Sequence, residues 1–158
     1  MMPKDNGNQI TELYRVHRPS TFKEMVGQAN AIRILVSKLQ TNSVPRTLLF
    51  IGPSGTGKTT AARVLKTKLG CGDSDWNEMD FAAIDKPLEA IRSVKSRVGL
   101  APISGKCRIW CCEEGQSLSR AKFAQQALLK ILEDTQAHVY FILTTTDPSK
   151  LIAAIKTR

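Results

Sequence analysis

Eight consecutive residues, Gly52 to Thr59, carry the side chains and backbone freedom that hold a polyphosphate; they read Gly-Pro-Ser-Gly-Thr-Gly-Lys-Thr. They follow an apolar run, Thr47 to Ile51, that is typical of a buried strand. Small residues let the backbone curl so that several N–H groups point at phosphate oxygens, and a helix starting near Lys58 adds the positive end of its dipole. Lys58 is expected to reach the β- and γ-phosphates, and the Thr59 hydroxyl to ligate Mg²⁺. The octet predicts a nucleotide-binding P-loop.

Two adjacent carboxylates, Glu113 and Glu114, leave a second β-prone run, Arg108 to Cys112. At a strand end the first carboxylate is expected to approach the Mg²⁺ shell, and the second to orient and deprotonate an attacking water. A solvated acidic strand end is the alternative interpretation. The run Thr144 to Asp147 offers a hydroxyl to the same water or to the γ-phosphate, although threonines are also common in strands for their β-propensity.

The elements that must position these groups follow from apolar spacing. Helices are predicted over Ile32–Leu39 with Asn30 as the N-cap, over Thr60–Leu69 stopped by Gly70 and Gly72, over Leu88–Val98 closed by Gly99 and Pro102, and over Phe123–Leu132. Strands are predicted over 47–51, 78–83, 108–112 and 138–145. Strands that alternate with helices indicate a parallel α/β sheet, whose ligands gather at the carboxyl ends of the strands. We expect one such domain over residues 10–158, after a mobile tail at residues 1–9.

Composition limits the class of protein. Lys and Arg number 23 against 14 Asp and Glu, and the resulting charge of +9 predicts an anionic partner such as nucleic acid, or merely aids solubility. The four cysteines lack paired CxxC spacing and a nearby histidine, so they predict reduced core thiols and no zinc site; they are Cys71, Cys107, Cys111 and Cys112. No apolar segment approaches the roughly 20 residues that span a bilayer, and no signal peptide is recognisable. A soluble cytoplasmic protein is expected.

Taken together, these motifs resemble the ATPase domain of clamp-loader subunits, which are AAA+ proteins. The similar proteins are the gamma/tau motor subunit of bacterial DNA polymerase III and the small subunits of replication factor C. The resemblance covers about Tyr14 to Arg158, and its specific elements are Tyr14–Phe22 followed by Val26–Gln28, the P-loop, Glu113–Glu114, Ala127–Glu133 and Thr145–Leu151. It implies a three-layer AAA+ sandwich that uses ATP and Mg²⁺. It also implies other clamp-loader subunits, a sliding clamp and primer–template DNA as partners.

The resemblance assigns roles residue by residue. The nucleotide would be contacted by Tyr14, Arg15, Arg18, Pro19, Val26 and Gly27, which belong to a segment that wraps the adenine, and by Gly52, Pro53, Ser54, Gly55, Thr56, Gly57, Lys58, Thr59 and Thr60. The metal ligands would be Thr59 and Glu113. Catalysis would involve Lys58, the base Glu114, Thr146 as the γ-phosphate sensor with Thr145 as the alternative, and Arg158 inserted into a neighbour's site. A frayed basic tail is the other interpretation of Arg158.

A DNA-contacting surface is also implied. Clamp loaders track duplex DNA with the helices that follow their second and third strands, which places Arg92, Lys95 and Arg97, with Arg120 and Lys122, near phosphates. Such contacts would be salt-sensitive and largely independent of sequence. A solvated helix face is the alternative.

Three departures from the family pattern matter. Glu113 stands where aspartate is usual, so the longer side chain is expected to shift the Mg²⁺ shell. No zinc module follows Cys71, so no second metal is carried over. No fifth strand, lid or collar fits after Arg158, and the missing strand would lie beside the P-loop strand. Thr47–Ile51 is therefore expected as an unpaired apolar edge, in a chain that is a fragment or needs another polypeptide to cover it.

Three other functions fit parts of the pattern. A Holliday-junction helicase of the AAA+ class shares the Val26–Gln28 region. A small P-loop kinase would fit the short length, although no insert for binding a phosphate acceptor is recognisable. A non-catalytic assembly module that holds ATP as a structural ligand would fit Glu113 and the missing lid.

Overall fold

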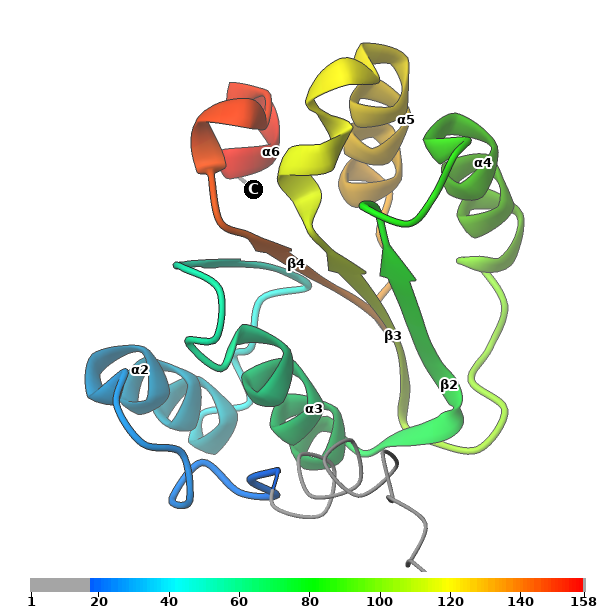
Figure 1. Cartoon of the computed structure of the whole chain (residues 1–158). Helices are drawn as coiled ribbons and strands as arrows, with labels where there is room; N and C mark the ends of the chain where they lie inside the picture. The colour runs from blue at the N-terminus through cyan, green and yellow to red at the C-terminus, as the bar shows by residue number, and fades with distance from the viewer. Residues whose placement is uncertain (1–17, 158) are drawn as a thin grey trace, which may run out of the picture.

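The computed structural model describes residues 18–157, which form alternating strands and helices (Figure 1). In chain order these are α2 (Ala29–Gln40), β1 (Thr47–Ile51), α3 (Lys58–Leu69), β2 (Cys71–Asp80), α4 (Pro87–Arg97), β3 (Cys107–Glu113), a 3₁₀ turn (Gly115–Arg120), α5 (Lys122–Glu133), β4 (Val139–Thr145), a second 3₁₀ turn (Pro148–Lys150) and α6 (Ala153–Lys156). Among these residues, no helix has the length and apolar character needed to cross a membrane.

The four strands form one parallel sheet in the order β1-β4-β3-β2. Two helices, α2 and α3, cover one face, and α4, α5 and α6 cover the other (Figure 1). Side chains alternate along β3, so Trp110 and Cys112 enter the core under α4 and α5, whereas Ile109 and Cys111 enter the core under α2 and α3. This arrangement confirms the predicted α/β three-layer sandwich with a parallel sheet.

The P-loop strand β1 lies at one side of the sheet and pairs with β4 alone among the described strands. Its residues Leu48, Leu49 and Phe50 are only half-buried, and Ile51 is 56% exposed. The prediction that Thr47–Ile51 forms an apolar edge strand is thus confirmed. An edge strand of this kind offers unpaired backbone groups to another strand.

The second strand was placed wrongly from sequence: β2 covers Cys71–Asp80, whereas residues 81–83 form a turn. Asp73 and Asp75 are poor strand formers, so residue type alone does not indicate that the strand begins at Cys71. The structure accommodates Asp75 because its carboxylate is bound by Arg108 and by two backbone N–H groups.

The cap of α2 was also placed wrongly. The helix begins at Ala29, after Gln28 in the left-handed conformation, and Asn30 instead accepts a hydrogen bond from Arg33. By contrast, α3 ends as expected at Gly70, whose φ of 71° suits a residue without a side chain.

A buried ion pair closes the amino end of β3. Asp75 is fully buried and accepts hydrogen bonds from the backbone N–H groups of Ile103 and Ser104, while Arg108 donates to it at 3.1 Å. Arg108 also donates to the carbonyl oxygens of Arg97 and Ala101, at 3.0 and 3.1 Å. These bonds fasten the loop between α4 and β3 to the sheet.

Candidate nucleotide-binding site

The P-loop connects the carboxyl end of β1 to the amino end of α3. Gly55 and Gly57 have φ angles of 77° and 86°, which glycine adopts without strain, and Gly57 precedes the first helical residue, Lys58. The Gly52 N–H donates to the carbonyl oxygen of Thr145 at 3.2 Å, which ties the start of the loop to the end of β4. The loop is therefore formed by local backbone geometry and held in place by the neighbouring strand.

Lys58 lies across the loop rather than in solvent. Its Nζ donates to the carbonyl oxygens of Gly52 and Pro53, each at 2.8 Å, and the Thr56 hydroxyl also donates to Pro53 at 2.8 Å. The ammonium is thus held over the concave side of the loop, where N–H groups at the start of α3 favour an anion. Thr59 and Thr60 are half-buried in the first turn of α3.

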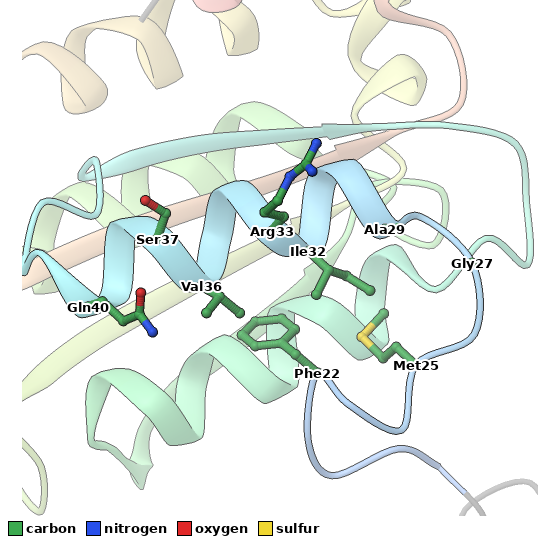
Figure 2. Close-up of a pocket in the computed structure, with 9 residues that line it drawn as sticks. All are labelled: Phe22, Met25, Gly27, Ala29, Ile32, Arg33, Val36, Ser37 and Gln40. Atoms are coloured by element: carbon green, nitrogen blue, oxygen red, sulfur yellow. The ribbon is translucent and has the colours of Figure 1, made fainter.

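The segment before α2 is anchored by apolar contacts. Figure 2 shows Phe22, Met25, Ile32 and Val36 gathered on the side of α2 that faces α3, whereas Arg33 and Ser37 point away. Phe22 is buried, so the ring fixes the path of residues 18–28 against the two helices. This packing brings a segment that is distant in sequence next to the P-loop.

A cavity of about 250 Å³ lies between that segment and the P-loop. Its lining includes Pro19, Val26 and Gln28 on one side and Gly55, Thr56, Gly57 and Thr60 on the other. Val26 is 99% exposed, so it presents an apolar surface suited to a flat base. The structure brings together two groups that the sequence assigned to one nucleotide, and their contact with it stays a prediction.

The glutamate pair lies at the carboxyl end of β3, two strands from β1. Glu113 is the last residue of β3, and its Oε1 is buried without a hydrogen-bond partner among the described residues. An orphaned buried carboxylate oxygen is stabilised by a cation, so this side chain fits the predicted Mg²⁺ ligand. Glu114 has a φ of 52°, in the left-handed region, and accepts a hydrogen bond from Gln116.

Gln116 was not singled out from the sequence, although it joins the two predicted catalytic segments. Its Nε2 donates to Glu114, and its Oε1 accepts from the Thr145 hydroxyl at 2.8 Å and from the Thr146 N–H at 3.1 Å. Thr145 is buried, whereas Thr146 is exposed at the end of β4. In the sequence, the one feature that could have pointed to Gln116 is its position two residues after Glu114. A lone glutamine there carries no recognisable chemistry.

The model of the family described as DNA polymerase III, delta subunit, matches residues 78–158, slightly more than half of the chain. The chain belongs to this DNA polymerase III family. The resemblance to clamp-loader subunits is thereby confirmed.

Curated relatives support the same family. The chain is 35% identical to the DNA polymerase III subunit tau of Salmonella typhimurium and 32% identical to the subunit gamma/tau of Mycobacterium bovis. Each alignment covers 92% of this chain but only 26% and 29% of the respective relative. The M. bovis alignment runs over 169 residues, more than the whole length of this chain, so the relative carries extra residues within the matched region.

Solved structures with the same fold include two proteins of Thermotoga maritima. The RuvB Holliday junction branch migration motor has a TM-score of 0.67 at 21% identity, over 89% of this chain and 46% of its own. A DNA polymerase III gamma subunit-related protein has a TM-score of 0.62 at 18% identity, over 78% of this chain and 43% of its own. At these identities the likeness concerns the fold alone.

In this DNA polymerase III family member, the predicted DNA-contacting side chains divide into two groups. Arg92, Arg120 and Lys122 line one cavity between α4 and α5, and neither Lys95 nor Arg97 is part of its lining. The Arg97 guanidinium lies 5.0 Å from the centre of the Trp110 ring, although the residue as a whole is exposed. Three predicted residues, Tyr14, Arg15 and Arg158, lie outside the described part of the family member.

Proposed function

We propose that this chain is the ATP-binding and ATP-hydrolysing module of a sliding-clamp loader that acts in DNA replication. One observation carries the proposal: the P-loop, the orphaned carboxylate oxygen of Glu113 and the Thr145–Thr146 pair meet at one edge of the sheet of a DNA polymerase III family member. The chain spans less than a third of the length of the M. bovis and S. typhimurium relatives, whose names are those of DNA polymerase III subunits.

Binding would use groups that already surround the P-loop. Backbone N–H groups from Gly55 to Thr59 donate to phosphate oxygens, and Lys58 exchanges its bonds to Gly52 and Pro53 for the β- and γ-phosphates. Thr59 and Glu113 hold Mg²⁺, whose charge offsets that of the phosphates. The base lies in the cavity beside Pro19 and Val26. Each of these groups was named from sequence, and the arrangement described above supports their joint use.

Hydrolysis would need a base and a group that detects the γ-phosphate. Glu114 takes a proton from the attacking water, while Gln116 fixes the carboxylate through its amide. Thr146 contacts the γ-phosphate from the exposed end of β4, and Thr145 is committed to Gln116. Arg158 is proposed to stabilise transition-state charge in a neighbouring subunit. Each site would then be completed by a partner, as a ring of clamp-loader subunits requires.

The proposed partners are other clamp-loader subunits, a sliding clamp and primer–template DNA. The half-exposed edge of β1 supports contact with another polypeptide, because Ile51 and Ile34 leave apolar surface in solvent beside unpaired backbone groups. The cluster of Arg92, Arg120 and Lys122 supports contact with DNA phosphates.

The test is nucleotide binding and turnover by the purified chain, with MgATP and with or without primer–template DNA. Lys58→Ala is expected to weaken MgATP binding by about 10- to 100-fold, because a charged hydrogen-bond donor to phosphate is lost. Glu114→Gln is expected to keep binding while lowering DNA-stimulated turnover by about 100-fold or more. Lys68→Ala, an exposed lysine at the far end of α3, is the matched control.

Each result has a defined meaning. Loss of binding in Lys58→Ala but not in Lys68→Ala supports the nucleotide site. Tight MgATP binding without turnover, even with DNA present, would replace the hydrolytic function by that of an ATP-binding assembly module. Phosphate transfer to a small metabolite in place of DNA-stimulated hydrolysis would indicate a kinase.

A further inference from the structure

Two of the four cysteines lie directly opposite each other on neighbouring strands. Cys71 is the first residue of β2, Cys107 is the first residue of β3, and the two are partners in the register of this parallel pair. Adjacent strands lie about 4.7–4.9 Å apart, which is within the Cα separation of about 4.4–6.8 Å that a disulfide spans. The spacing of the two strands therefore suits a bond between these residues.

Backbone contacts hold the two strands together at this point. The Lys106 N–H donates to the carbonyl oxygen of Gly70 at 2.8 Å, one residue before each cysteine. A Cβ atom at Gly105 would lie 2.3 Å from the backbone nitrogen of Gly72, so the chain before β3 approaches β2 more closely than any residue with a side chain allows. Both cysteine side chains enter the core under α2 and α3. The thiols are thus kept on one face and side by side.

This pair is also the less deeply buried half of the cysteines. Cys71 is 7% exposed and Cys107 is 3% exposed, whereas Cys111 and Cys112 are 0% and 1% exposed. Among the described strands β2 pairs with β3 alone, and α3 leads into it through Gly70 (Figure 1). A molecule as small as hydrogen peroxide therefore needs little local opening to reach this pair.

The two thiols of the pair differ in acidity. A hydrogen bond from the Cys71 thiol, together with the charge of Arg46, holds the pKa of Cys107 below its usual value despite burial. The same interaction between the thiols, followed by burial, raises the pKa of Cys71. Burial also raises the pKa of Cys111, and that of Cys112 to about 12. Because the thiolate is the reactive form of cysteine, Cys107 is the cysteine that reacts first.

We propose that Cys71 and Cys107 form a reversible disulfide when the protein meets hydrogen peroxide, so that the start of the β2–β3 pair acts as a redox-sensitive clasp. The Cys107 thiolate attacks one oxygen of the peroxide, the O–O bond breaks, and Cys107 becomes a sulfenic acid. The hydroxide that leaves takes up the proton that Cys107 released.

The second step closes the disulfide. The Cys71 sulfur attacks the sulfur of the Cys107 sulfenic acid, the S–O bond breaks, and the hydroxyl group leaves as water with the proton of the Cys71 thiol. In total the two thiols lose two electrons, which reduce one peroxide to two molecules of water. A dithiol reductant restores both thiols by exchange.

The bond would close a loop that contains the rest of β2 and the whole of α4. Closing a loop of this length restricts the unfolded chain, so oxidation is expected to stabilise the fold. Both cysteines lie at the amino ends of their strands, whereas the P-loop and the glutamates lie at the carboxyl ends. MgATP binding is therefore expected to stay the same.

The experiment treats the full chain, purified with reduced thiols, with hydrogen peroxide in native buffer and in denaturant. Free thiols are then alkylated, and disulfide-linked peptides are identified by mass spectrometry. The native chain is expected to yield one peptide pair joined through Cys71 and Cys107, and to keep Cys111 and Cys112 as alkylated thiols. Urea denaturation is expected to show an unfolding equilibrium constant roughly 100-fold smaller for the oxidised chain, and a dithiol reductant is expected to abolish the difference.

Three variants separate the roles of the thiols. Cys71→Ala is expected to stop the reaction at the Cys107 sulfenic acid, which dimedone traps. Cys107→Ala is expected to leave Cys71 reduced under the same treatment. Cys112→Ala removes a buried thiol from the other face of the sheet, and as the matched control it is expected to keep the linked peptide pair. The peptide map of the unmodified chain decides the pairing even where a variant fails to fold.

Three outcomes would overturn the inference. Disulfides between chains, or through Cys111 or Cys112, would reject the pairing of Cys71 with Cys107. A linked pair that forms only in denaturant would show that the folded chain keeps the two thiols from reacting. An oxidised chain that is no more stable than the reduced chain would reject the clasp. None of these outcomes concerns MgATP binding or turnover, so the proposed function is tested separately.

Discussion

The two ends of strand β3 differ in how completely a charged side chain is hydrogen-bonded. At the amino end, the buried Arg108 guanidinium is bound by Asp75 and by the carbonyl oxygens of Arg97 and Ala101. At the carboxyl end, the Oε1 atom of Glu113 is buried without a hydrogen-bond partner among the described residues. Because an unsatisfied buried charge costs free energy, the first end contributes to stability and the second retains binding capacity for a ligand.

Left-handed backbone conformations occur at both edges of the sheet. Among the described non-glycine residues with left-handed φ, Gln28 lines the cavity beside Gly55 and Gly57, Glu114 follows the carboxyl end of β3, and Asn42 lies in the loop between α2 and β1. Such residues cost on the order of 1–3 kcal/mol and persist where the surrounding structure holds them. Gln28 and Glu114 thus hold such conformations next to residues that are proposed to contact the nucleotide.

Removing the buried ion pair at the amino end of β3 is expected to have the largest effect on stability. Asp75→Ala leaves Arg108 buried without its carboxylate, and should lower the free energy of unfolding by about 3–5 kcal/mol. Urea denaturation measures the change. Asp73→Ala is the control: the Asp73 side chain is fully exposed, so the loss of its pair with Lys66 should cost less than about 1 kcal/mol. Similar losses in the two variants would remove the distinction between the ends of β3.

Removing the Gln116 hydrogen bonds at the carboxyl end of β3 should affect ATP turnover more than stability. Gln116→Leu removes the hydrogen bonds that join Glu114 to Thr145 and Thr146, and should lower ATP turnover by about tenfold while MgATP binding is kept. Steady-state kinetics and a binding titration measure the two quantities. Gln116→Asn retains the amide on a shorter side chain and should recover part of the rate. A loss of binding in step with the loss of rate would assign Gln116 to folding of the site.

Neutralising the orphaned carboxylate should have a smaller effect on stability, and one of opposite sign. Glu113→Gln removes the charge of a half-buried carboxylate whose Oε1 atom is buried without a partner among the described residues, so the free energy of unfolding without metal should rise by about 1 kcal/mol. In the same variant, stabilisation by MgATP over ATP with a chelator should disappear. Thermal or urea denaturation follows both, with the exposed loop residue Asp85→Asn as the charge-matched control. A destabilised Glu113→Gln chain would mean that Glu113 is paired in the folded protein.

The smallest expected effect is a pH dependence confined to acid. Burial raises the pKa of Asp75, but hydrogen bonds from the N–H groups of Ser104 and Ile103 and the charge of Arg108 outweigh it, so the pKa lies below its ordinary value. A carboxyl with a lowered folded-state pKa contributes stability that is complete above the unfolded pKa of about 4 and is lost as pH falls below it.

Urea midpoints should therefore fall below about pH 4 in the unmodified chain, and fall less in Asp75→Asn. The variant Asp73→Ala removes an exposed carboxylate and is expected to keep most of the slope of the unmodified chain. Equal slopes in the unmodified chain and Asp75→Asn would assign the acid loss to other carboxyls.

Features could be predicted from the sequence where the residues that determine them lie close together along the chain. The P-loop was recognisable because glycines, a lysine and a strand–helix boundary occur within thirteen residues, Thr47 to Thr59. The end of α3 at Gly70 was recognisable for the same reason, since one left-handed glycine stops a helix. By contrast, β2 was placed wrongly in part because its buried Asp75 is stabilised by Arg108, which lies far along the chain.

The sequence by itself determined the parallel α/β architecture, the phosphate-binding loop and the strand that delivers the glutamates, because each depends on apolar spacing or local backbone freedom. Only the tertiary structure decided that Gln116 links Glu114 to Thr145, that Arg92 joins Arg120 and Lys122 around one cavity, and that Asp75 is buried at all. These contacts join residues on different elements. Their energies depend on distance in space and on exclusion of water, which the order of residues along one chain does not specify.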